Sequence, residues 1–168
     1  MFEIKFNVAG EEQYARAFDV MANEVTRLKD PLSRVSEQLT RSVGEQFETE
    51  GAHGTGAKWT ELNKAYEDWK DEHYPGRPML VRTGAMRRAF LVDGERELTD
   101  ERLIWGVDTQ TDDDGEAIAA RAAAHQTGDG VPERKIIALT KADRRAIDRS
   151  FVEWFNGVRH SLLGEGPL

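Results

Sequence analysis

A long stripe of apolar residues near the start of the chain is the feature that most constrains the fold. From Tyr14 to Phe47, apolar side chains recur every three or four positions, which is the spacing of one face of an α-helix. Pro31 interrupts the stripe, because the residue before a proline is disfavoured in the helical conformation. The pattern predicts two consecutive helices, or one kinked helix, ending near Gly51, with Asp30 as the cap of the second helix and Pro31 in its first turn. Such a seam is compatible with a coiled coil, but its short length favours core packing.

Shorter patterns predict the other elements. Apolar runs are expected to be strands at residues 2–8, 90–92, 102–107 and 135–139. Helices are expected at residues 63–73, 84–90, 115–126 and from 141 onward, with Thr83 capping the second and a Thr140–Asp143 capping box opening the last. Tyr66, Trp69 and His73 are expected on one side of the first of these helices, and Gly128 is expected to end the third. Few strands, unevenly placed helices and no repeated βαβ unit predict an α+β fold. In this fold a small, mostly antiparallel sheet packs with the N-terminal helix or kinked helix pair and with a C-terminal helix.

Two further expectations concern packing. The stretch at 51–57 is rich in glycine and is expected to be a mobile loop. The last helix carries apolar residues at three- and four-residue spacing from Ile147 to Leu162, including Phe155, so one wide face of it is expected to be buried.

Composition indicates a single domain. The 168 residues are about one domain in length, which we place at residues 1–163 with 164–168 as a flexible tail. The absence of cysteine excludes disulfides, thiol nucleophiles and thiolate metal sites, and it fits a reducing cytoplasm. No apolar run approaches the length needed to cross a bilayer, and the opening residues do not read as a signal peptide, so no membrane partner is expected.

Negative charge is concentrated in one section of the chain. From Asp93 to Glu116 there are ten acidic and two basic residues, a net charge of −8, which equals the net charge of the whole chain. Because phosphate binding requires Lys and Arg, this section is not expected to grip DNA. Two interpretations remain. The section is a solvated hairpin that keeps the protein soluble, or it lines or rims a channel through which DNA slides, with Asp112, Asp113, Asp114 and Glu116 as the candidate residues.

Three motifs follow one another between residues 80 and 134. They read LVRTGAM at 80–86, WGVDT at 105–109 and AAAHQTG at 122–128, followed by Pro132 and Arg134. In this order they resemble the tail-completion, or virion-morphogenesis, proteins of tailed bacteriophages. The slots of the family pattern are filled by Phe47, Trp59, Leu62, Leu80, Thr83, Gly84, Met86, Gly106, Thr109, Ala122, His125, Gln126, Gly128, Pro132 and Arg134. Two slots depart from it, since Arg121 stands where the family usually has tyrosine and Lys135 where it usually has a second proline.

The resemblance implies a structural virion protein with no enzymatic activity and no cofactor. Proteins of this kind form a ring, commonly hexameric, at the head-proximal end of the tail, where they stop tail-tube polymerisation and join the tail to the head. The implied partners are further copies of the chain, the tail-tube protein and a head–neck connector protein, with DNA passing through without specific binding. The implied location is the tail or neck of the virion, after assembly in the host cytoplasm. A head-side connector or a morphogenesis factor is the alternative within virion assembly.

Motif residues and clustered arginines are the candidates for subunit contacts. The arginines near the Thr83–Gly84 turn and at the start of the last helix form either solvated faces or the basic side of an interface that meets the acidic section of the next copy. The candidate interface residues are Thr83, Gly84, Arg87, Arg88, His125, Gln126, Arg134, Arg144 and Arg145.

Catalytic and metal-binding patterns are weak. The four histidines fall in different predicted elements, so no metal site is expected. No phosphate-binding glycine loop or nucleophile elbow occurs, and the run from Asp112 to Glu116 lacks the alternating ligands of a calcium loop. His125 could be the base of a small hydrolase, but nothing in the sequence supplies its nucleophile or orienting acid. We therefore expect no catalytic residues and a structural hydrogen-bonding role for His125.

Overall fold

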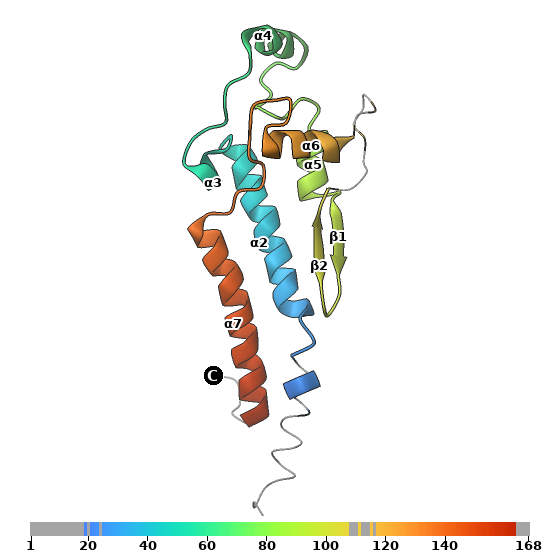
Figure 1. The fold of residues 1–168 in the computed structure, drawn as a ribbon, viewed down its shortest axis with the longest axis vertical. Helices are drawn as coiled ribbons and strands as arrows, with labels where there is room; N and C mark the ends of the chain where they lie inside the picture. Colours follow the sequence, from blue (N-terminus) through green and yellow to red (C-terminus); the bar gives the residue numbers. More distant parts are fainter. Residues whose placement is uncertain are drawn as a thin grey trace, which may run out of the picture.

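Two long antiparallel helices organise the molecule. The computed structural model describes Asp19 and residues 21–23, 25–107, Thr111, Gly115 and 117–163. The two helices lie side by side along the length of the molecule, a two-stranded hairpin flanks the first of them, and shorter helices gather at one end (Figure 1). This arrangement confirms the predicted α+β class. The predicted strand at 2–8, the start of the apolar stripe and the tail at 164–168 lie outside the described residues.

The first long helix, α2 (Lys29–Glu48), follows a turn at residues 25–28. Helical residues precede this turn, so the chain forms two consecutive helical segments, as predicted, and Pro31 lies in the first turn of α2, where its missing N–H is not needed. Asp30 is not the cap, which corrects the prediction. Leu28 is the N-cap residue, and its N–H donates to the carbonyl of Asp100 in the hairpin turn at 2.8 Å. A tertiary contact therefore fixes the start of α2.

The apolar stripe of α2 is core packing. Val43 and Phe47 are 1% and 2% exposed, while Leu39 is half-buried. The helix contacts α7, α5, α3 and the hairpin, so its sides are covered by different elements rather than by one coiled-coil partner. In the core, Phe47 packs edge-on against Trp59 with ring centroids 5.8 Å apart, and against Phe90 at 6.4 Å.

The hairpin consists of β1 (Glu95–Leu98) and β2 (Leu103–Gly106), paired antiparallel with Arg96 opposite Trp105. The predicted strand at 102–107 is confirmed. The predicted strand at 90–92 is wrong, because Phe90 belongs to helix α5 (Ala85–Leu91) and is buried in the core. Instead β1 is a polar strand held by its partner: the Arg96 guanidinium lies over the Trp105 ring, 4.7 Å from its centroid, and donates to the carbonyls of Phe90 and Gly106.

The glycine-rich stretch at 51–57 contains a packed helical turn, α3 (Ala52–Thr55), which corrects the prediction of a mobile loop. Gly51 is buried with φ +99°, a conformation that favours glycine, and a Cβ there would lie 2.4 Å from the Trp59 ring. A Cβ at Gly54 would lie 2.2 Å from the Ala138 carbonyl oxygen. These glycines therefore permit close packing.

Two helical glycines are expected to respond oppositely to alanine. Gly54→Ala should lower the free energy of unfolding by about 1 to 3 kcal/mol, because the new methyl group overlaps fixed backbone. Gly157→Ala, in a helix where a Cβ meets nothing within 4 Å, should raise it by about 0.5 to 1 kcal/mol. Urea unfolding of both variants measures the difference, and a Gly54→Ala protein as stable as the wild type would contradict the close approach.

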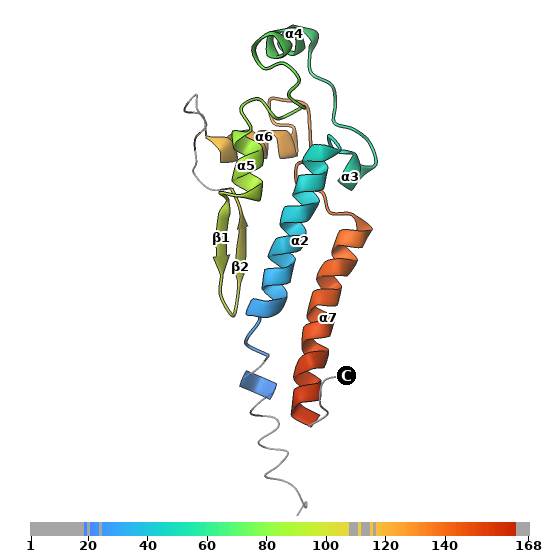
Figure 2. The same ribbon diagram turned by 180° about the vertical axis from the view of Figure 1, so that it is seen from behind.

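Helix α4 (Lys64–His73) stands apart from the rest of the molecule, at the end where α2 finishes (Figures 1 and 2). The Asn63 side chain caps it by accepting from the Tyr66 N–H at 2.9 Å. Along one side Trp69 stacks on both Tyr66 and His73, with ring centroids 5.5 and 4.8 Å apart, as the predicted spacing requires. The helix is thus an arm that carries aromatic side chains.

Helices α5 and α6 (Ile118–Thr127) pack together beneath this arm. The Thr83 hydroxyl accepts from the Ala85 N–H at 3.3 Å, as predicted, while Gly84, with φ +88°, is the N-cap residue of α5. Gly128 ends α6 in the left-handed conformation, which confirms its predicted role as a stop.

The predicted strand at 135–139 is not formed. The Gln126 side-chain oxygen accepts from the N–H of Ile136 at 2.9 Å, and the side chains of Gln46 and Trp59 donate to the Lys135 carbonyl at 2.7 and 3.0 Å. Ile136 is 1% exposed. Because side chains satisfy the buried backbone here, the apolar run needs no partner strand.

Helix α7 (Lys141–Leu163) begins with the predicted capping box. The Thr140 hydroxyl accepts from the Asp143 N–H at 3.0 Å, and the Asp143 carboxylate accepts from the Thr140 N–H at 2.7 Å. Its apolar face is less buried than predicted, since α2 packs along it but leaves Phe155 49% exposed. Val152, which lies outside the predicted face, is 57% exposed. None of the helices in the described ranges is long and apolar enough to span a membrane.

Candidate functional site

A cavity of about 570 Å³ lies between the arm α4 and the α5–α6 layer, in the size range of binding pockets. Motif residues that are far apart in the sequence meet in its wall: Leu80, Thr83, Gly84, Met86, His125, Pro132 and Arg134. The structure therefore places four of the predicted interface candidates, Thr83, Gly84, His125 and Arg134, around one hollow.

Two buried cations attach the arm to this cavity. Arg134 is 4% exposed and donates from its guanidinium to the carbonyls of Thr60 and Glu61, at 2.9 and 3.0 Å. Burial lowers the pKa of Arg134, yet a guanidinium stays charged at any ordinary pH. Lys70, also 4% exposed, donates to two carbonyls in the loop after α4, those of Arg77 and Pro78. Sequence reasoning missed Lys70, because its position on α4 carries no pattern that distinguishes it from the exposed lysines nearby.

His125 lines the cavity from α6 and is held in its neutral form. Burial lowers its pKa, and so do the positive charges of Arg134 and Arg121, while a hydrogen bond with the backbone of Pro132 opposes the shift. Its Nδ1 atom is buried and has no hydrogen-bond partner among the described residues. Because Pro132 has no N–H, the neutral imidazole donates its single proton to the Pro132 carbonyl, and the buried Nδ1 is left as an acceptor that is not exposed to the cavity.

The other predicted candidates lie elsewhere. Gln126 supports the 135–137 backbone and does not line the cavity. Arg87 pairs with Glu48 at 3.5 Å and Arg88 with Asp93 at 2.9 Å. Arg144 and Arg145 are exposed on α7, away from the cavity wall. Asp112, Asp113, Asp114 and Glu116 lie outside the described residues.

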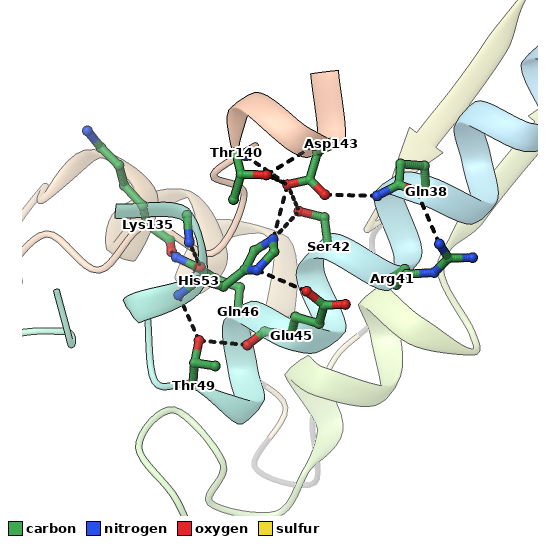
Figure 3. Close-up of polar contacts among 11 residues, drawn as sticks. Gln38, Arg41, Ser42, Glu45, Gln46, Thr49, His53, Lys135, Thr140 and Asp143 are labelled. Carbon is green, nitrogen blue, oxygen red and sulfur yellow. Dashed lines mark hydrogen bonds and ion pairs between the residues drawn. The ribbon is translucent and has the colours of Figure 1, made fainter. Parts of the chain in front are cut away.

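A second polar cluster joins α2, α3 and α7 around Asp143, as Figure 3 shows. The Asp143 carboxylate accepts from the hydroxyls of Ser42 and Thr140, at 3.1 and 2.8 Å, and from the Gln38 amide at 2.8 Å. His53 lies beside it, with Nε2 3.0 Å from the same carboxylate and Nδ1 2.9 Å from a carboxylate oxygen of Glu45. Burial alone would raise the pKa of Asp143, but the hydrogen bonds from Thr140, His53 and Ser42 outweigh it, and the pKa lies below its ordinary value.

Ser42, His53 and Asp143 are the residue types of a hydrolase triad, but their arrangement is structural. A catalytic serine gives its proton to the histidine, whereas the Ser42 hydroxyl already donates to Asp143. Ser42 is also 1% exposed, at the junction of three helices, where no substrate can approach. Sequence reasoning missed this cluster because His53 falls in the stretch predicted as a loop, and only the capping box pointed to Asp143.

Comparison with known proteins identifies the family. A search of curated proteins and a search of solved structures each found no match to the chain. The model of the phage virion morphogenesis family matches residues 10–156, a range that includes the cavity, the arm, the Asp143 cluster and most of α7. The chain therefore belongs to the phage virion morphogenesis family and has a role in building the virion.

Proposed function

We propose that the chain is a structural subunit that forms a ring at the head-proximal end of the phage tail, stops tail-tube polymerisation and joins the tail to the head. Family membership supplies the assembly role, and the arm α4 is the observation that supports a ring-forming subunit. In this role the protein acts by binding its neighbours through repeated contacts and does not catalyse a reaction.

The arm exposes residues that usually stabilise protein interfaces. Tyr66 and Trp69 are each 38% exposed although they stack on one another, and Arg82 lies over the Tyr74 ring at their base, 5.9 Å from its centroid. Tyrosine, tryptophan and arginine are enriched among the residues that dominate binding energy. An aromatic surface on a projecting helix is therefore suited to a neighbouring copy or to the tail-tube protein.

A second exposed apolar surface supports head-to-tail contacts. Val152 and Phe155 of α7 are on a different element from the arm, and the two surfaces differ in residue type. Two unlike surfaces on one subunit make a heterologous contact, which closes into a ring when the rotation between copies fits. We take a hexamer as the expected copy number, with DNA passing through unbound.

The hydrolase alternative has less support. Burial, and after it the positive charges of Arg134 and Arg121, lowers the pKa of His125 and favours its neutral form. Neither arginine is a nucleophile, and in the Asp143 cluster the Ser42 hydroxyl donates to the carboxylate rather than to a histidine. A head-side connector or a morphogenesis factor remains the alternative within virion assembly, and it predicts a different defect in particles.

Trp69→Ala tests the proposal. The variant should fold normally, because Trp69 is partly exposed on the arm, and should weaken self-association or binding to the tail tube at least about thirtyfold, the effect of losing a dominant interface residue. Native mass spectrometry with and without tail-tube protein measures this, and Val92→Ala, at an isolated residue 73% exposed, is the control.

Phage particles assembled without the protein distinguish a tail terminator from a head-side connector. A tail terminator predicts tail tubes of excess length that are not joined to heads. A head-side connector predicts tails of normal length that remain separate from heads. Finished particles with normal tails would contradict both roles.

A further inference from the structure

We infer that the arm α4 of one copy of the chain docks on the exposed face of α7 in the next copy. The inference rests on the proposed ring, because it names the two surfaces that meet between neighbouring subunits. Its basis is the positive charge at the start of α7, the acidic and aromatic residues of the arm, and the separation of these two helices within one molecule.

The start of α7 carries positive charge in an unfavourable place. Between residues 141 and 149 the only exposed acidic side chain is Asp148, whereas the exposed basic side chains are Lys141, Arg144, Arg145 and Arg149. None of these four side chains has an ion pair or a hydrogen bond within the part of the chain that the structure describes. Because the N-terminus is the positive end of a helix dipole, cations in the first turn lower stability. The fold of one subunit does not account for these cations, and a counter-charge from another molecule would.

The same exposed face of α7 continues into an apolar surface. An α-helix repeats every 3.6 residues, so Arg145, Arg149 and Val152 lie on one side of α7, and Phe155 follows next to them. The opposite side packs on α2, and Ser150 is buried there. The exposed face of α7 therefore offers cations and, beside them, apolar side chains that are about half exposed or more.

The arm has a face of complementary composition. Asp68 and Glu72 are exposed and four positions apart, so they are neighbours on the surface of α4. Trp69, which is 38% exposed, lies three positions before Glu72 and so borders the same face. Lys64 pairs with Asp68 at 2.9 Å, but both side chains are largely exposed, and such a pair contributes little.

The two faces match in spacing as well as in charge. Two carboxylates four positions apart on α4 can meet two guanidinium groups four positions apart on α7, those of Arg145 and Arg149. The same contact brings Trp69 onto the apolar part of the α7 face. Ion pairs between exposed side chains add little affinity, but they select the partner and its orientation, while a covered tryptophan supplies binding energy.

Within one subunit the two faces lie apart. The arm stands beyond the end of α2, whereas α7 starts near α3 and runs toward the other end of the molecule (Figures 1 and 2). A contact between them therefore joins two copies. Because the two faces are unlike, each copy uses its arm toward one neighbour and its α7 toward the other, which is the head-to-tail arrangement of a ring.

The hairpin turn is the competing acidic surface. Asp100 and Glu101 are exposed there, but the acidic residue of β1 nearest to them, Glu97, already pairs with Arg102. The apolar side chains of β1 and β2 are all partly buried, so the hairpin offers no counterpart to Trp69. The arm therefore matches both the charge and the apolar part of the α7 face, and the hairpin turn matches only the charge.

Exchanging the charges of the two faces tests the inference. One chain carries Asp68→Lys with Glu72→Lys, and a second chain carries Arg145→Glu with Arg149→Glu. Each chain alone should self-associate at least about tenfold more weakly than the wild type, because like charges then face each other. Mixed in equal amounts, the two chains should assemble again with alternating subunits, since every contact joins opposite charges. Native mass spectrometry with and without tail-tube protein measures both effects.

Two controls accompany the exchange. All four side chains are exposed, so neither chain should unfold at an appreciably lower urea concentration than the wild type. A control chain with Asp100→Lys and Glu101→Lys reverses two exposed charges on the hairpin turn. It should assemble like the wild type and should not restore assembly of the chain with reversed charges on α7. The wild type gives a further measurement, since its self-association should weaken as salt screens the charges.

Each other outcome overturns the inference. Restored assembly with the hairpin chain would assign the basic face of α7 to the hairpin turn. Two reversed chains that fail alone and do not assemble together would show that the two faces contact different partners. A wild-type oligomer that neither reversal weakens would reject the contact while the ring stands. A wild type that forms no oligomer under either condition would reject the ring as well.

Discussion

Asp143→Ala is expected to lower the free energy of unfolding by about 3 to 5 kcal/mol, the range for removing one member of a buried charged network. The carboxylate is the shared acceptor for Ser42, His53, Thr140 and Gln38, so its loss leaves buried donors without partners and opens the cap of α7. Urea unfolding at neutral pH measures the effect. Asp148→Ala, at an exposed position on the same helix, should change stability by less than about 0.5 kcal/mol.

The same carboxylate makes stability depend on pH in a definite direction. Because the pKa of Asp143 is lower in the folded protein than in the unfolded chain, its contribution is fully present above the unfolded value of about 4. It is lost as the pH falls through the folded pKa. Between pH 5 and pH 3 the wild type should therefore lose more stability than Asp143→Asn, which has no charge to lose. Equal losses in the two proteins would show that Asp143 does not sustain the junction.

The elements that the sequence predicts correctly are those set by neighbouring residues. The capping box of Thr140 and Asp143, the Thr83–Gly84 turn and the Gly128 stop each depend on contacts within a few residues, and each is confirmed. The aromatic spacing of α4 is likewise a local pattern. Local hydrogen bonding and periodicity are visible in sequence because they do not require knowledge of the fold.

The errors come from contacts between distant parts of the chain. The start of α2 depends on Asp100, the segment at 135–139 depends on Gln46 and Trp59, and β1 depends on Trp105 rather than on apolar alternation. The glycines at 51–57 led to the prediction of a mobile loop. The close approach of Gly54 to Ala138, which requires glycine there, cannot be deduced from composition.

Only part of the candidate site can be predicted from the sequence, because its residues are brought together by contacts between distant parts of the chain. The motif order singled out Thr83, His125 and Arg134, which do meet in one cavity, but the resemblance and not the chemistry of each residue grouped them. Lys70 completes the wall without any sequence signal. The Asp143 cluster joins Ser42 to a residue 101 positions away, a distance over which no pattern extends.

Phe47→Ala is expected to be as damaging as Asp143→Ala, with a loss of about 3 to 5 kcal/mol from an emptied aromatic site. Phe47 is 2% exposed at the centre of the aromatic core and contacts the rings of Trp59 and Phe90. Because small domains are stable by only about 5 to 15 kcal/mol, much of the variant should be unfolded at moderate temperature. Thermal unfolding followed by circular dichroism measures the change.

Phe155→Ala is the matched control for Phe47→Ala, and it also tests whether the exposed face of α7 takes part in assembly. The same side chain is removed, but Phe155 is 49% exposed on α7, so the free energy of unfolding should fall by less than about 1 kcal/mol. If the exposed face of α7 is an assembly surface, this variant should keep its fold and still fail to complete particles, whereas Phe47→Ala should fail through loss of folded protein. A Phe155→Ala chain that supports normal particle yield would show that this face meets no partner, and the argument for a ring from two unlike surfaces would be lost.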